Sequence, residues 1–228
     1  MPLRGATIRV RGAFALVVAS IGLPAAATDA SACLAPAREA ATLHWSEPAR
    51  VVSPSRVWAI EVDARAGLRS DDNETPVALI RCSDGRRVPL FVLTRAARMQ
   101  WSPRGNRLLV LDRPGAGHHE LRFYDAERIA GRRSANDADR IDSVVRDAVR
   151  DRLGPTNTIA FYTASVAAWR NDRLTLSIAL QAANGATGPL RPFCYGVVLD
   201  TSAMAVEAVL SETETKKRYP NATCRMTR

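Results

Sequence analysis

The chain has 228 residues, of which 46% are hydrophobic and 24% charged, with a formal net charge of +9. Arg outnumbers Lys by 30 to 2, yet no basic block is interleaved with aromatic residues, so the charge indicates a solvated basic surface and argues against a nucleic-acid partner. After the N-terminal segment, no apolar run approaches the roughly 20 residues of a transmembrane helix.

The N-terminal segment has the features of a secretory signal peptide. Three arginines precede a short apolar run from Ala13 to Leu23, and the small residues Ala25–Ala27 form a cleavage signal. We therefore expect residues 1–27 to be removed, leaving a single domain over residues 28–228 with 29 basic and 23 acidic residues, a charge of +6. The leader and the Arg-rich composition are typical of a bacterial protein, so the expected location is periplasmic or secreted.

The four cysteines are expected to form disulfides. An even number of cysteines in an exported chain usually pairs in this way, and the absence of a Cys-x-x-Cys pair argues against zinc. Of the three possible pairings, we favour the one that ties each terminal segment to a strand. That pairing joins Cys33 to Cys82 and Cys194 to Cys224. Pairing of Cys33 with Cys224 is one alternative, and lipidation of Cys33 after Ala30–Ala32 is another.

Two stretches of the chain share one pattern: a Ser-Pro turn, an Arg, an apolar strand and a closing Asp. They are residues 53–63, SPSRVWAIEVD, and residues 102–112, SPRGNRLLVLD, which begin 49 residues apart. A looser third copy, residues 169–180, lacks the Ser-Pro turn, but its Leu and Ile residues alternate with polar or small ones as in a half-buried strand. A period near 50 is typical of propeller-blade repeats.

One helix is expected inside this repeat and another after it. An apolar stripe and a terminating Gly-Pro predict a helix over residues 136–154. Trp101 and Trp169 lie 68 residues apart, and removing the 19 residues of this insert returns the same period of 49. A capping box at Ser211–Glu214 predicts a short C-terminal helix.

The Trp-Ser-Pro-x-Gly turn at residues 101–105, the strand after it and the strand at residues 119–125 together resemble the beta-propeller repeats of WD-like and Tol-system periplasmic propeller proteins. In those families the motif leads the chain into the inner strands of a blade, with Pro fixing the turn and Gly allowing a positive φ. The resemblance covers residues 51–125 and, more loosely, residues 167–210. It implies a fold and not a function.

Three modules can be counted, over residues 53–101, 102–169 and 170–210, whereas closed propellers have four to eight blades. The expected fold class is therefore all-β, with about three propeller-blade-like antiparallel modules in an open or sandwich-like stack, one inserted helix and a short C-terminal helix. Leu43–Trp45 is expected to add an outer strand to the last module. Pairing of two chains and a diverged fourth blade are the alternatives. Further strands are expected at residues 77–82, 88–93, 195–200 and 206–210.

One candidate for a binding site is the segment His118–His119–Glu120, in a Gly-rich stretch between two strands. One histidine with Glu120 and a distant carboxylate could bind zinc, but adjacent residues of an extended chain point to opposite faces, so no metal site is expected. The sequence contains no Walker loop, His-Glu-x-x-His helix or nucleophile elbow. No catalytic residue and no cofactor are therefore assigned.

Other conspicuous residues fit structural roles. Asp63, Asp112 and Asp125 close predicted strands, where such acids hold turns by accepting backbone N–H bonds. The four tryptophans fit the core of a blade better than platforms for a sugar, because three of them mark the repeat itself.

The sequence thus predicts an exported protein that binds another envelope protein through loops, with residues 115–120 and 183–191 as the most exposed segments. A secreted hydrolase with a loop-borne carboxylate or metal site, an inhibitor or immunity-type protein, and a purely structural envelope component are the alternatives. A deep pocket that joined His118, His119 or Glu120 to Asp residues would favour the enzyme, whereas a shallow face would favour binding. The oligomeric state stays open.

Overall fold

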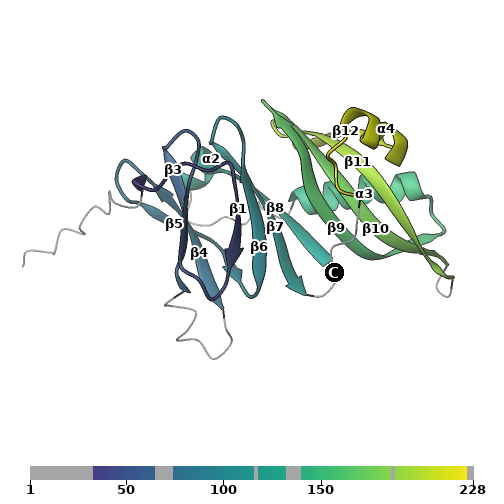
Figure 1. Ribbon diagram of the computed structural model, residues 1–228, viewed down its shortest axis with the longest axis horizontal. Coiled ribbons are helices and arrows are strands. Elements are labelled where there is room, and N and C mark those ends of the chain that lie inside the picture. Colours follow the sequence, from purple (N-terminus) through teal and green to yellow (C-terminus); the bar gives the residue numbers. More distant parts are fainter. Residues whose placement is uncertain (1–32, 65–73, 116–117, 132–139, 186–187, 225–228) are drawn as a thin grey trace, which may run out of the picture.

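The structure, a computed structural model, describes residues 33–64, 74–115, 118–131, 140–185 and 188–224. Its strands form three four-stranded antiparallel sheets, which follow one another across Figure 1 and which we call the N-terminal, middle and C-terminal sheets. The expected fold class, all-β with about three antiparallel modules and few helices, is therefore confirmed; the described residues contain the two expected helices and one more. The expected signal peptide lies outside the described residues.

In the N-terminal and C-terminal sheets, strands that are neighbours in space are also consecutive along the chain; in the middle sheet, β1 is the exception. The N-terminal sheet contains β2 (Ala49–Val52), β3 (Trp58–Val62), β4 (Thr75–Arg81) and β5 (Arg87–Leu93). The middle sheet contains, in spatial order, β1 (Ala40–His44), β6 (Ala96–Trp101), β7 (Arg107–Gly115) and β8 (His118–Asp125). The C-terminal sheet contains β9 (Asn157–Arg170), β10 (Arg173–Asn184), β11 (Leu190–Asp200) and β12 (Ala205–Leu210). One parallel pair, His118 of β8 with Tyr162 of β9, joins the middle and C-terminal sheets.

The middle sheet is the centre of the stack because both of its faces are apolar. On β7, Leu108 and Val110 pack into a core shared with the N-terminal sheet, and Leu109 and Leu111 pack into a core shared with the C-terminal sheet. Successive side chains of a strand point to opposite faces, so one continuous apolar run supplies two cores. Each such buried side chain stabilises the fold by about 1.5 to 3 kcal/mol.

The two Ser-Pro turns have the same geometry. Ser53 and Ser102 are both buried; the N–H of Trp58 donates to Ser53 Oγ at 3.3 Å, and the N–H of Arg107 donates to Ser102 Oγ at 3.1 Å. The turns join β2 to β3 and β6 to β7, and the third copy of the pattern likewise joins β9 to β10. The three modules expected from the sequence each start at the turn. In the structure, the strand before each turn belongs to the same sheet as the strand after it, so each expected module starts one strand too late.

The prediction that Leu43–Trp45 adds a strand to the last module is wrong. β1 contains Leu43 and pairs with β6 of the middle sheet, with Leu43 opposite Ala97. Leu43 is buried in the core between the N-terminal and middle sheets. Alternating side chains indicate which face of a strand is buried, but they do not identify the strand beside it.

The inserted helix is α3 (Arg140–Leu153), within the range of residues 136–154 that the apolar stripe predicted. Ile141, Val145 and Val149 are spaced by four residues and are at most 2% exposed. This spacing places them on one face of the helix, which packs into the core between the middle and C-terminal sheets.

Two short helices begin at N-terminal caps. α2 (Ala126–Ala130), which was not predicted, starts at Asp125, whose carboxylate accepts a hydrogen bond of 3.1 Å from a backbone N–H of the first turn. α4 (Glu212–Arg218) has the predicted capping box between Ser211 and Glu214. Among the described residues, no helix is long and apolar enough to cross a membrane.

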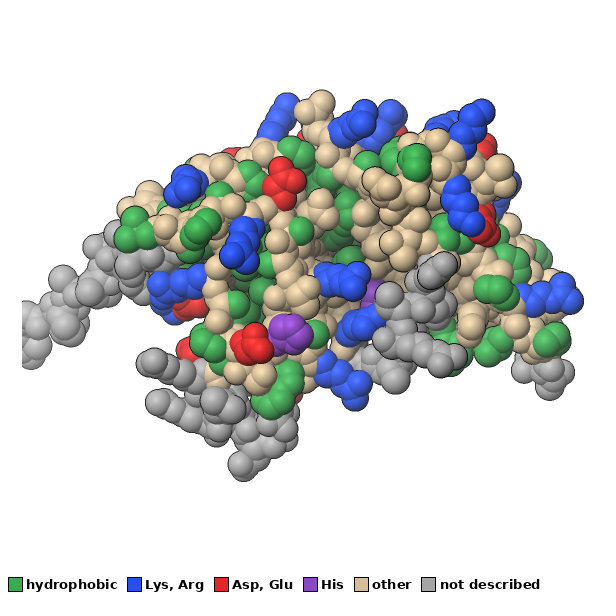
Figure 2. Space-filling view, viewed as in Figure 1, with side chains coloured by type: hydrophobic (Ala, Val, Ile, Leu, Met, Phe, Trp, Pro, Cys, Tyr) green, Lys and Arg blue, Asp and Glu red, His purple; other side chains and the backbone are tan. Residues whose placement is uncertain are grey.

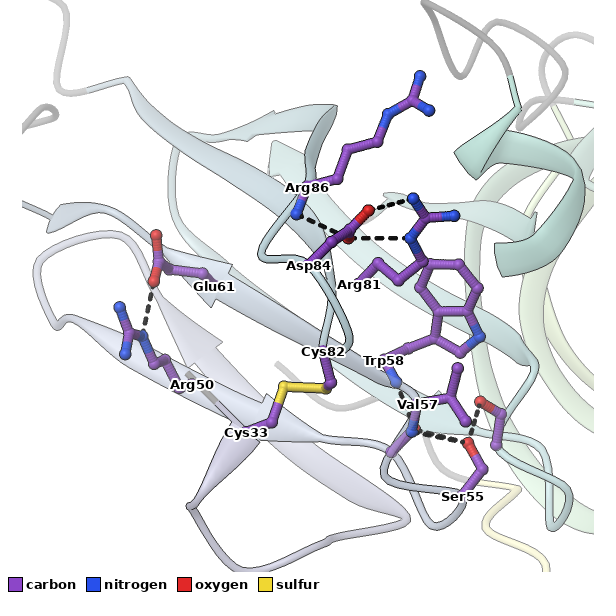
Figure 3. Close-up of a disulfide and its surroundings, with 12 residues drawn as sticks. Cys33, Arg50, Ser55, Val57, Trp58, Glu61, Arg81, Cys82, Asp84 and Arg86 are labelled. Atoms are coloured by element: carbon purple, nitrogen blue, oxygen red, sulfur yellow. Dashed lines mark hydrogen bonds and ion pairs between the residues drawn. A yellow bond between two sulfur atoms is a disulfide. The ribbon is translucent and has the colours of Figure 1, made fainter. Parts of the chain in front are cut away.

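The two disulfides have the favoured pairing. Cys33 is bonded to Cys82, which ties the segment before β1 to the end of β4 (Figure 3). Cys194 is bonded to Cys224, which ties the segment after α4 to β11. Because the sulfur of Cys33 is part of a disulfide, it carries no lipid in this structure.

The tryptophans of the repeat are part of the core, as predicted. Trp58 and Trp101 are 4% and 1% exposed in the core between the N-terminal and middle sheets. Trp169 is 8% exposed in the other core, where its ring lies 6.1 Å from that of Phe123. Trp45 is partly buried against the first of these cores. The indoles of the three repeat tryptophans are therefore not platforms for a sugar.

Candidate functional site

His119 is a buried link between the middle and C-terminal sheets. Its side chain is 4% exposed, and Nδ1 lies 3.1 Å from the amide nitrogen and 3.3 Å from the carbonyl oxygen of Ala164 on β9. Nε2 accepts a hydrogen bond of 2.6 Å from Arg113 Nε, because the guanidinium group can only donate. Burial and the positive charge of Arg113 lower the pKa of His119 to about 4. His119 is therefore buried, whereas the segment 115–120 was expected to be exposed.

The other two predicted residues are the neighbours of His119 on β8. The backbone of His118 pairs with Tyr162 and Gly115, and its side chain lies outside what the structure describes. Glu120 is half-buried, and its carboxylate accepts a hydrogen bond of 2.7 Å from Arg122. As expected for an extended strand, His119 and Glu120 have different surroundings. In the described part of the chain, no group of three His, Cys, Asp or Glu residues could hold a metal ion.

Glu120 lines an open groove of about 520 Å³ between β8 and α3, which we call the β8–α3 groove. Three acidic and three basic side chains contribute to its walls, together with Leu121 and Ser143. Two of the charged residues lie on β8 and four on α3. The four on α3 share one face of the helix because residues spaced by three or four positions, about one turn, lie on the same side of it. The charged residues are Glu120, Arg122, Asp142, Arg146, Asp147 and Arg150.

Asp142 and Arg146 hold the two walls of the β8–α3 groove together. One carboxylate oxygen of Asp142 accepts a hydrogen bond of 3.2 Å from the N–H of Leu121, and the other lies 2.6 Å from Arg146 Nε. Arg146 also donates to the carbonyl oxygen of His119 at 3.2 Å, and its guanidinium lies 4.8 Å from the centre of the Tyr162 ring. Burial raises the pKa of Asp142, while Arg146 acts in the opposite direction.

Asp112 is a buried acid beside the groove. Its side chain is 4% exposed and lies 3.4 Å from Arg122, which therefore bridges Asp112 and Glu120. Burial raises the pKa of Asp112, and the charge of Arg122 opposes this shift. The residue lies within β7 and does not close the strand, so the turn-holding role predicted for it is wrong. Asp125, by contrast, does hold a turn as the cap of α2.

The outer rim of the β8–α3 groove is accessible to a partner. Asp147 and Arg150 form an ion pair of 2.9 Å, and their side chains are 65% and 60% exposed. An exposed pair of this kind adds at most about 1 kcal/mol to stability, so its charges can be redirected to another molecule at low cost. The groove therefore presents charges of both signs from a helix and a strand.

A second groove, which the sequence did not indicate, lies between the middle and C-terminal sheets. It measures about 450 Å³ and we call it the sheet groove. It is lined by Ala40, Ala41, Thr42, Arg98, Met99, Gln100, Leu109, Leu111, Ser165, Val166 and Thr223. These residues come from three strands of one sheet, the edge strand of another and the C-terminal segment, so only the tertiary fold brings them together.

Comparison of the chain with protein-family models, with curated proteins and with solved structures found no match. The resemblance to WD-like and Tol-system propellers thus remains a prediction from the repeat.

Proposed function

We propose that the chain is an exported interaction module that binds another protein of the bacterial envelope through the β8–α3 groove. The observation that carries this proposal is the pairing of each acidic side chain in the groove with an arginine. Such a surface is complementary to a partner that carries charges of both signs, and charge complementarity directs encounter and specificity.

The same pairing argues against the hydrolase alternative. Asp142 is engaged by Leu121 and Arg146, and Glu120 by Arg122, so neither is poised as a nucleophile or an acid. His119 has both ring nitrogens engaged and a pKa of about 4, below the range in which a general base operates at neutral pH. The groove is also open rather than deep, which favours a protein surface over a small substrate.

Export is supported by the two disulfides, since such bonds persist in oxidising compartments. Both join segments that lie at the ends of the described chain to strands of a sheet. If the partner is a secreted enzyme, the chain acts as an inhibitor or immunity-type protein.

The proposal can be tested by capture from the exported fraction of the native host with three forms of the mature protein. The first is the wild type, and the second exchanges the charges of the rim pair through Asp147→Arg with Arg150→Asp. The third is a matched control, Glu212→Lys with Lys216→Glu, which exchanges an exposed ion pair on α4. Both exchanges keep the net charge and alter a helical pair.

We expect the wild type and the α4 exchange to recover the same stoichiometric protein, and the rim exchange to lose it. Loss of enzymatic activity in a captured enzyme would specify an inhibitor. Equal recovery by all three forms would place the interface elsewhere, and recovery of nothing by the wild type would contradict the interaction hypothesis.

A further inference from the structure

The outer edge of β9 is largely free of strand partners. β9 pairs with β10 over almost its whole length, from Asn157 to Arg170. On its other side, the described residues provide one strand pair, His118 with Tyr162. Beyond that pair the described residues give no further β8–β9 pairing, and Ser165 and Val166 of β9 line the sheet groove. A free strand edge is a template for a further strand.

The backbone of Val166 faces the sheet groove. The N–H and C=O of Ala164 point away from β10, because both lie against the ring of His119. In an antiparallel ladder the backbone groups of residues two apart point to the same side, and the register is regular from Ala164 to Val166. Val166 lines the groove, and no hydrogen-bond partner for its backbone is found on that side in the described part of the chain.

The walls of the sheet groove suit an extended peptide. Leu109 and Leu111 alternate along β7 and lie buried beneath the groove. Thr42, Gln100 and Ser165 add side chains that can donate or accept hydrogen bonds. The volume of about 450 Å³ lies within the range of roughly 300 to 1,000 Å³ that is usual for ligand sites.

The charge of the sheet groove selects an acidic occupant. Arg98 lines the groove, its side chain is exposed, and it has no ion pair with any residue that the structure describes. No acidic side chain is among the described residues that line this groove. In the view of Figure 2, Lys and Arg side chains gather in the middle of the face, over the region where Figure 1 shows β6 to β9.

We propose that the sheet groove binds an extended peptide segment of another protein, which adds as a strand to the free edge of β9 and places a carboxylate against Arg98. Strand addition provides affinity through backbone hydrogen bonds and specificity through alternate side chains. The site is separate from the β8–α3 groove, so either binding proposal can fail without the other.

The test is selection from a displayed library of random ten-residue peptides on the immobilised mature chain. Parallel selections use Arg98→Gln and a matched control, Arg191→Gln, which removes another exposed arginine on β11. We expect the wild type and Arg191→Gln to enrich peptides with Asp or Glu at one fixed position. Replacing that residue by Asn or Gln should weaken binding at least about tenfold, because the ion pair with Arg98 is lost.

Hydrogen exchange at the Val166 amide separates strand addition from binding elsewhere. An enriched peptide should slow exchange of this amide, and the same peptide with N-methyl groups at alternate positions should not. No enrichment above background, enrichment that is insensitive to Arg98→Gln, or unchanged exchange at Val166 would each overturn the proposal. Protection of Val166 that grows with protein concentration in the absence of peptide would assign the edge to a second copy of this chain, which also overturns it.

Discussion

The imidazole of His119 lies against the backbone of Ala164, 45 residues further along the chain, with Nδ1 between 3.1 and 3.3 Å from its amide nitrogen and carbonyl oxygen. This contact follows directly after the one strand pair that the described residues form between β8 and β9. It therefore ties the C-terminal sheet to the middle sheet. The carbonyl oxygen of His119 also accepts a hydrogen bond of 3.2 Å from Arg146, so this residue contacts both β9 and α3.

The first prediction concerns pH. The pKa of His119 is lowered from 6.5 to about 4 in the folded protein, so between these values the unfolded chain binds a proton that the folded chain does not. Stability should therefore be complete above about pH 6.5 and fall as the pH decreases toward 4, by up to about 3 kcal/mol. Urea unfolding at several pH values measures this.

The control for the pH prediction is His119→Gln, which can still bond to Ala164 but does not titrate in this range. The difference in unfolding free energy between the two proteins should shrink as the pH falls, because only the wild type loses stability through His119. The raised pKa values of Asp112 and Asp142 affect both proteins alike and cancel in the difference. A constant difference from pH 7 to 4 would contradict the buried, neutral state of His119.

The second prediction concerns Gly105 in the second Ser-Pro turn. Its φ is +68°, and a Cβ there would lie 2.6 Å from the backbone nitrogen of Ser55 in the first turn. Gly105→Ala should therefore destabilise the fold by about 2 to 4 kcal/mol. Gly185 has a similar φ of +71° but open space around it, so Gly185→Ala should cost about 1 kcal/mol. Equal losses in thermal or urea unfolding would show that the two turns do not pack together.

The third prediction concerns Trp101, which is 1% exposed between the N-terminal and middle sheets. Trp101→Ala should lower the unfolding free energy by about 3 to 5 kcal/mol because it leaves a large cavity. Trp45→Ala should cost less, since that side chain is only partly buried. A near-neutral effect of Trp101→Ala on denaturant unfolding would mean that the indole lies at the surface.

The fourth prediction concerns export and oxidation. Intact-mass measurement of the protein from its native host should show cleavage near Ala27 and a deficit of about four hydrogens, two for each disulfide. Alkylation under denaturing conditions should label no thiol before reduction and four after it, since the chain has four cysteines. Free thiols in the unreduced sample would contradict the oxidised framework.

The sequence predicted best those features that depend on local chemistry. The Ser-Pro turns at Ser53 and Ser102, the capping box at Ser211 and the apolar stripe of α3 each have a short-range signature, and each is present in the structure. The apolar run of β7 also predicted a buried strand. It did not show that the two faces of this strand belong to two separate cores.

The sequence could not predict features that depend on how distant segments meet. β1 was assigned to the wrong sheet because its pattern does not specify its neighbour. His119 was expected in an exposed loop, and its burial depends on Ala164 and Arg113, which approach from other parts of the chain. The sheet groove is formed by residues of β1, β6, β7, β9 and the C-terminal segment, which meet only in the tertiary fold.

The most direct test of the interaction hypothesis is site-specific photocrosslinking in the native host, with the crosslinking residue placed at Asp147 on the rim of the β8–α3 groove. The matched position is Glu212 on α4, whose side chain is exposed to a similar degree, 50% against 65%. A single crosslinked protein from position 147 and none from position 212 is the predicted result. The same product from both positions, or from position 212 alone, would contradict the β8–α3 groove as the binding site.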